Sequence, residues 1–223
     1  MARTTFYPLL SLMLAASLSG ACSSEIDGKP KAQVEDVKKV EAKAETKTET
    51  KTDAQAAATR TLKLDKAGSS VSFVGAKLTG DHKGGFEEFE GTATLAGDKV
   101  TALSVTVKTT SVTSDAADLT GHLRSKDFFE VETYPTAVFT ASEFVPKTGE
   151  NGVTHELGGE LELHGVKKAI RFPAKITVDA QGAQGQAEFT INRKDFKIEY
   201  PGKPDDLIKD EVLLKLDLKF KAG

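Results

Sequence analysis

The alternation of apolar and polar residues with a period of two constrains this chain more than any other feature of its sequence. It is clearest in residues 155–163, where leucines and a glycine occupy one face and glutamates dominate the other. Similar alternation recurs in residues 71–73, 89–95, 103–107, 170–178, 187–191 and 212–220. A period of two places successive side chains on opposite faces of a β-strand. We therefore expect antiparallel strands with one dry and one wet face, because parallel strands would be continuously apolar.

Short segments rich in turn-forming residues separate these runs, at residues 96–98, 147–152, 164–165 and 179–182. Only residues 116–126 have helical spacing, with Leu119 and Leu123 on one side. About eight strands, short connections and one short helix predict an all-β domain, either a barrel or a two-sheet sandwich. Pro173 within a long strand indicates an edge or a bulge, because proline donates no ladder hydrogen bond.

The dry faces of these strands would form the interior of the domain at residues 60–223. They carry aliphatic and phenylalanine side chains, and the chain has no tryptophan. The one cysteine excludes an intrachain disulfide, so the apolar interior has to stabilise the fold. An eight-stranded barrel either fills its interior with side chains or holds one small ligand there. The alternation alone leaves both possibilities open.

Residues 1–21 have the organisation of a signal peptide. Arg3 supplies positive charge before a short apolar run at residues 9–18, and the small residues at 19–21 suit a cleavage site. The apolar run is too short to span a bilayer as a helix. We therefore expect an exported protein.

Cys22 follows the small residues directly, and the segment LSGAC at residues 18–22 resembles a bacterial lipobox. The match departs from the usual motif at Ser19, where leucine is common, and ordinary signal-peptide cleavage is the alternative. Lipidation of Cys22 would anchor the protein to a membrane. Because Ser23 is not the aspartate of inner-membrane lipoproteins, we expect a periplasm-facing outer-membrane lipoprotein, or otherwise a soluble periplasmic or secreted protein.

Residues 22–59 predict a disordered, low-complexity linker. Residues 31–58 contain no aromatic residue, leucine or isoleucine, and so cannot bury enough surface to offset the entropy of ordering. About 35 such residues span roughly 30–35 Å. The linker would then let the domain at residues 60–223 sit clear of a membrane.

The charge and the motifs exclude several classes of function. A formal net charge of −3 argues against a nucleic-acid partner, which would require a basic face. The sequence has no phosphate-binding glycine loop, zinc or calcium motif, paired-cysteine motif or nucleophile elbow. We therefore expect no catalytic residues, no metal and no cofactor, while the oligomeric state stays open.

Four segments together point to a known family: HLRSKDFF at 122–129, YPTAVF at 134–139, GELELHGVKK at 159–168 and INRKDF at 191–196. Their order and spacing resemble the YceI-like family of exported bacterial proteins, over essentially all of residues 60–223. The resemblance implies a lipocalin-like, eight-stranded antiparallel barrel that binds a polyisoprenoid or another long-chain amphiphile. The family usually has glycine where Lys197 stands, which puts the local loop geometry in question.

The barrel interior is the expected ligand site, lined by Phe73, Phe139, Leu161, Leu163, Phe172, Ile176, Phe189, Ile191, Leu214 and Leu216. His122 and Arg193 are candidates for contacts with a polar head group. Arg193 shares the parity of the inward residues, and its alternative role is a structural ion pair with Asp127 or Asp195. For His122, the alternative is a hydrogen-bonded structural residue.

These features lead to one principal hypothesis and two alternatives. The principal hypothesis is an exported carrier that holds a polyisoprenoid, quinone-like or fatty amphiphile inside the barrel. The first alternative is a non-binding structural or stress-protective envelope lipoprotein with a solid core. The second is an enzyme acting on such a lipid through His122 and Arg193, which no motif supports.

Overall fold

The computed structural model describes residues 24–37 and 58–222. The predicted signal peptide, Cys22 and residues 38–57 of the predicted linker lie outside the described residues. No helix in the described ranges has the length and apolar character needed to cross a membrane.

The described part of the chain contains thirteen strands: β1 (Gln33–Asp36), β2 (Thr59–Leu64), β3 (Ser70–Lys77), β4 (Gly80–Phe86), β5 (Phe89–Ala96), β6 (Lys99–Lys108), β7 (Val112–Ser114), β8 (Thr136–Pro146), β9 (His155–Leu163), β10 (Val166–Val178), β11 (Gly182–Asn192), β12 (Gly202–Lys203) and β13 (Asp206–Lys221). One α-helix, α1 (Ala117–Arg124), falls within the predicted helical segment. Four short 3-10 turns complete the fold: η1 (Lys66–Gly68), η2 (Thr109–Ser111), η3 (Glu150–Gly152) and η4 (Arg193–Phe196).

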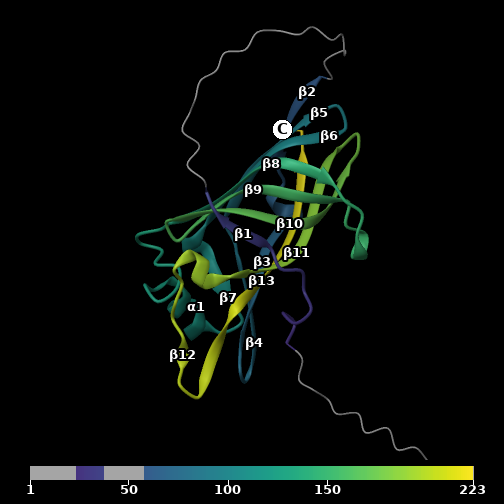
Figure 1. Ribbon diagram of the computed structural model, residues 1–223. Coiled ribbons are helices and arrows are strands. Elements are labelled where there is room, and N and C mark those ends of the chain that lie inside the picture. The colour runs from purple at the N-terminus through teal and green to yellow at the C-terminus, as the bar shows by residue number, and fades with distance from the viewer. Residues whose placement is uncertain (1–23, 38–57, 223) are drawn as a thin grey trace, which may run out of the picture.

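Eight of these strands close into an antiparallel barrel (Figure 1). The ring runs β2-β5-β6-β8-β9-β10-β11-β13 and returns from β13 to β2. β3 pairs with a further stretch of β13 and is followed by β4 and β7. The prediction of an eight-stranded antiparallel barrel with one helix is confirmed, and the sandwich alternative is excluded.

The hairpin of β9 and β10 shows how closely the alternation determines this fold. β9 spans the residues with the clearest alternation, and its leucines face inward. The two-residue connection of His164 and Gly165 has φ values of 51° and 70°. Positive φ at both positions is typical of the type I′ turn, whose twist matches that of the flanking strands.

β8 was not predicted, because a bulge reverses its alternation. The pairing of β8 with β9 shifts register between Ala141 and Glu143. Phe139 and Phe144 therefore both face the interior although they differ in sequence parity. The alternation of apolar and polar residues changes parity at the bulge, so the sequence of β8 shows no continuous period of two.

One end of the barrel is closed by α1 and the segments around it. Leu123 of α1 packs with Phe73, Val112, Phe128 and Ile198 in a buried cluster. Figure 1 shows α1 at this end beside β7, where the Ser114 N–H donates to the Thr120 hydroxyl at 2.9 Å. We call α1, together with the segments that contribute Phe73, Val112, Phe128 and Ile198 to this cluster, the end cap.

Lys197, at the end of η4, stands where the family usually has glycine. Its φ is 59° and its ψ is 25°, in the left-handed region. Glycine adopts this conformation without steric cost, whereas lysine is strained there. The loop geometry is therefore the one that glycine favours, and this chain holds it with lysine.

The prediction of a disordered linker is wrong for residues 24–37, which pack on the outside of the barrel ring. Ile26 and Ala32 are buried, and β1 pairs with β10. These residues bury themselves on a surface that the barrel provides, which composition alone does not indicate. β1 therefore packs on the barrel although it precedes residues 60–223, which the sequence predicts as the domain.

Carboxylates fasten this N-terminal segment to the barrel. Glu25 lies between Lys215 of β13 and Lys83 of β4, with Glu25 Oε2 3.0 Å from Lys83 Nζ. Hydrogen bonds from Lys215 and then Lys83 lower the pKa of Glu25 from 4.5 to about 2. Lys209 and Lys168 likewise lower the pKa values of Asp27 and Asp36.

We predict that acid loosens residues 24–37 before the barrel unfolds. Because the folded-state pKa of Glu25 is depressed, its stabilisation is complete above pH 4.5 and is lost as the pH falls toward 2. The protection factors of the Ala32 and Thr190 amides, measured by hydrogen exchange, should fall in this pH window, whereas those of β9 amides should not. Glu25→Gln should remove much of this pH dependence. Constant protection of Ala32 between pH 5 and pH 2 would show that the carboxylates do not hold the segment.

Candidate ligand-binding cavity

The barrel is hollow. A cavity of about 240 Å³ lies within it, bounded by the inner faces of the ring strands, by β3 and by the end cap. The choice between a solid core and a cavity, which the alternation left open, is therefore decided in favour of a cavity.

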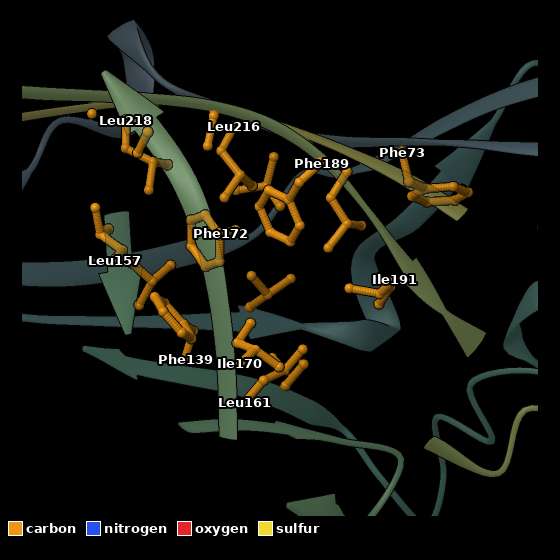
Figure 2. A pocket seen from close by; sticks show the side chains of 18 of the residues that line it. Phe73, Phe139, Leu157, Leu161, Ile170, Phe172, Phe189, Ile191, Leu216 and Leu218 are labelled. Carbon is orange, nitrogen blue, oxygen red and sulfur yellow. The ribbon is translucent and has the colours of Figure 1, made fainter. Parts of the chain in front are cut away.

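All ten residues predicted to face the interior line this cavity: Phe73, Phe139, Leu161, Leu163, Phe172, Ile176, Phe189, Ile191, Leu214 and Leu216. Figure 2 shows most of them pointing into a common space from several strands. Their contact with a ligand stays a prediction, whereas their position follows directly from strand parity.

Phenylalanine rings form one wall of the cavity. Phe172 of β10 and Phe189 of β11 stack with centroids 4.0 Å apart and an interplanar angle of 12°. Phe139 of β8 meets Phe172 at 5.4 Å in a tilted arrangement (Figure 2). These contacts fix the rings in position around the space, so the cavity is already shaped before a ligand enters.

Sequence reasoning missed several lining residues. Leu157 and Leu218 follow the same alternation and were available from parity. Phe144 was hidden by the bulge in β8. Phe128 and Phe129 lie in a loop after α1, where no periodic signal exists.

The cavity offers a ligand almost nothing but hydrocarbon. Among its described lining residues, only Gln184, Gln186 and Arg193 have polar side chains. The amide nitrogens of Gln184 and Gln186 donate to Asp217, at 2.8 and 3.0 Å. Among residues 24–37 and 58–222, no group of three or more His, Cys, Asp or Glu is placed to hold a metal ion.

Arg193 is fully engaged with protein oxygens. Its side chain is 5% exposed, Nη1 donates to the Ile198 carbonyl at 2.7 Å, and Nε donates to the Lys209 carbonyl at 3.1 Å. Nη2 lies 3.4 Å from Asp210 Oδ1, so the ion pair is with Asp210 and not with Asp127 or Asp195 as predicted. Burial lowers the pKa of the guanidinium. These bonds favour the structural interpretation of Arg193 over a head-group contact.

His122 lies in the end cap and is not among the residues that line the cavity. Its Nε2 is 2.9 Å from Asp127 Oδ2, and its ring packs at 4.9 Å against both Phe128 and Tyr200. This placement also favours the structural alternative over a head-group contact.

The four segments that carry the family resemblance converge in and around this end cap. Arg124 donates to the Val112 carbonyl at 3.0 Å, and His164 Nδ1 is 3.1 Å from the Phe196 carbonyl. The Tyr134 ring packs against His164 with centroids 4.7 Å apart. The residues of these motifs therefore hold one another in place and shape the end of the barrel.

We predict that Arg193→Ala lowers the free energy of unfolding by about 2–4 kcal/mol, because it leaves buried carbonyl oxygens without donors. Urea denaturation would measure the change. Arg171→Ala is the control, since Arg171 pairs with Glu143 on the surface, and it should leave the free energy of unfolding nearly unchanged. A stable Arg193→Ala variant that has lost ligand affinity would instead restore Arg193 as a head-group contact.

The comparisons with known proteins agree with this architecture. Residues 62–220 match the model of the YceI-like domain family. A UPF0312 protein of Pectobacterium carotovorum is 37% identical over 126 residues, which cover 52% of this chain and 62% of that relative. The aligned segments thus span somewhat less than two thirds of the length of the first curated relatives.

Two solved structures share the fold. BcnA of Burkholderia cenocepacia superposes with a TM-score of 0.61 and 22% identity, over 70% of this chain and 98% of BcnA. A polyisoprenoid-binding domain from Saccharophagus degradans superposes with a TM-score of 0.59 and 20% identity, over 73% of this chain and 98% of that domain. At these identities the likeness establishes the fold.

Proposed function

The chain belongs to the YceI-like family, and on this premise we propose that it is an exported carrier that holds a polyisoprenoid, quinone-like or fatty amphiphile inside its barrel. The observation that carries the proposal is the preformed cavity, whose wall is almost entirely hydrocarbon. The polyisoprenoid-binding domain from Saccharophagus degradans, which shares the fold, supports the same class of ligand.

The energetics favour a chain-like ligand of moderate affinity. Burying ten methylene groups contributes about 8 kcal/mol, at about 0.8 kcal/mol each. Association costs about 4–15 kcal/mol in lost motion and ordering, and a preformed cavity keeps this cost low. Since Gln184, Gln186 and Arg193 are bonded to protein groups, the polar side chains of the cavity wall are poorly placed to bind the polar end of the ligand.

The alternatives have less support. A solid-core structural protein is not favoured, because the interior is hollow. An enzyme acting through His122 and Arg193 is not favoured, because both side chains are committed to protein partners.

We also propose that Cys22 is lipidated after export. The lipid would anchor the protein to the periplasmic side of the outer membrane. Cys22 precedes Ser24 by two residues, and the Ser24 hydroxyl donates to Asp81 Oδ1 of β4 at 2.7 Å. Two residues of chain reach at most about 7 Å. A lipid on Cys22 would therefore hold the barrel close to the membrane, not at the distance that a long linker would allow.

Filling the cavity tests the proposed ligand site. Gly185 of β11 lines the cavity, and a Cβ added there meets no atom within 4 Å. Gly185→Leu should therefore lower the affinity for geranylgeraniol and cis-parinaric acid by about tenfold or more without destabilising the fold, because leucine occupies ligand space and glycine weakens strands. Fluorescence titration would measure affinity, and native mass spectrometry of protein from its own bacterium would reveal a bound amphiphile.

Gly121→Leu is the matched control. A Cβ at Gly121 also meets open space, but this residue lies on α1 and not on the cavity wall, so affinity should not change. Unchanged affinity in Gly185→Leu would place the ligand elsewhere. An unmodified chain that binds neither probe and carries no amphiphile would refute the carrier proposal and favour a non-binding envelope protein.

A further inference from the structure

The barrel ring has two short ladders. β13 pairs with β2 only at Phe220 and Lys221, and β3 pairs with the stretch of β13 that precedes them. The other short ladder lies between β10 and β11. These strands pair only at Lys175–Val178 with Ala183–Gln186. β10 begins at Val166 and β11 continues to Asn192, so their remaining lengths diverge from each other. A gap of this kind exposes unpaired backbone groups on both strands.

β1 occupies this gap, which we call the seam. Gln33–Asp36 pair antiparallel with Lys168–Arg171 of β10. On the other side, the Ala32 N–H donates to the Thr190 carbonyl at 2.9 Å, and the Thr190 N–H donates to the Pro30 carbonyl at 2.8 Å. One short strand from the N-terminal segment therefore joins β10 to β11 where they do not join each other.

β1 covers the cavity wall at the seam. Ala32 is 4% exposed and, with Val34, packs against the cluster that contains Ile170, Phe189 and Ile191. These three residues also line the cavity. Gln33 and Glu35, on the other face of β1, are exposed to solvent. A single strand thus separates solvent from the cavity wall here.

The side-chain ion pairs that hold β1 and the residue-31 end of the segment are few and lie near the surface. Beyond the backbone pairing of β1, Lys168 Nζ lies 2.5 Å from Asp36 and Lys31 Nζ lies 2.8 Å from Glu211. Exposed ion pairs of this kind contribute little to stability. Ile26, by contrast, is buried against Val74, Ala76 and Leu213, so the N-terminal segment has an attachment that does not depend on β1.

We propose that β1 is the gate of the cavity, and that ligand enters and leaves through the seam when β1 detaches from β10 and β11. The inference rests on the proposed carrier function and adds its route of exchange. β1 lies outside residues 62–220, which match the family model, so the gate is not part of the matched domain. At the end cap, Leu123 and Phe128 close the barrel with buried side chains.

A reversible cross-link tests the gate. Glu35 and Ala169 are register partners across β1 and β10, and neither lines the cavity. Paired residues in antiparallel strands lie about 4.5–5.5 Å apart at Cα, which suits a disulfide. We would introduce Glu35→Cys and Ala169→Cys into the full chain carrying Cys22→Ser, and follow the uptake of cis-parinaric acid by stopped-flow fluorescence.

Oxidation should slow uptake and release by about 100-fold or more, since the cross-link removes the open state, and a reductant should restore both rates. The matched control is Thr140→Cys with Glu160→Cys, register partners across β8 and β9, which should leave the rates unchanged on oxidation. Val34→Ser gives a test in the opposite direction, because weaker packing of β1 should speed exchange several-fold without a cross-link.

The outcomes separate the two proposals. Rapid uptake by the oxidised seam variant, or equal slowing in the β8–β9 control, would overturn the gate and leave the carrier function intact. Absence of binding in the reduced variants and in the unmodified chain would overturn the carrier function, and the gate with it.

Discussion

An eight-stranded ring encloses a narrow interior, and the size of its inward-facing side chains decides whether that interior is solid. Small residues recur on the inner face of this barrel among the phenylalanines and leucines: Gly75, Ala93, Ala137, Ala174, Gly185 and Ala187. Each leaves unoccupied volume, and the wall around that volume lacks dispersion contacts on one side. A hydrocarbon chain entering the cavity would restore those contacts and remove its own surface from water. The small apolar residues on the inner face therefore account for the cavity, for its apolar wall and for the space that a long-chain ligand would fill.

The polar side chains with the strongest claim to chemistry stabilise the end cap. Arg193 holds the carbonyls of Ile198 and Lys209, and His122 pairs with Asp127. These groups belong to the segments that identify the family, so the family motifs record how the barrel is closed. If the chain carries an amphiphile as proposed, specificity would depend on the shape of the apolar wall, since Gln184, Gln186 and Arg193 already donate to protein oxygens.

The sequence was sufficient for most of the barrel and for the residues that face its interior, because strand parity is a local property. It failed where structure depends on a distant partner. The bulge in β8 moves Phe144 to the inner face, and no local pattern marks that shift. Asp210 pairs with Arg193 because the loops around η4 and β13 bring them together. Residues 24–37 are too polar to fold alone, yet Ile26 and Ala32 are buried by a surface that exists only after the barrel has formed.

That last failure bears on how the carrier would exchange its ligand. A closed ring of continuous ladders protects a hydrocarbon from water but gives it no lateral way out. In this barrel the ladder between β10 and β11 is short, and the strand that completes it comes from a segment whose carboxylates and backbone bonds lie near the surface. The stacked rings of Phe172 and Phe189 maintain the inner wall across the same seam. Different elements thus shape the cavity and release the ligand. The rings of Phe172 and Phe189 preserve the shape of the cavity, and only β1 has to move for the ligand to leave.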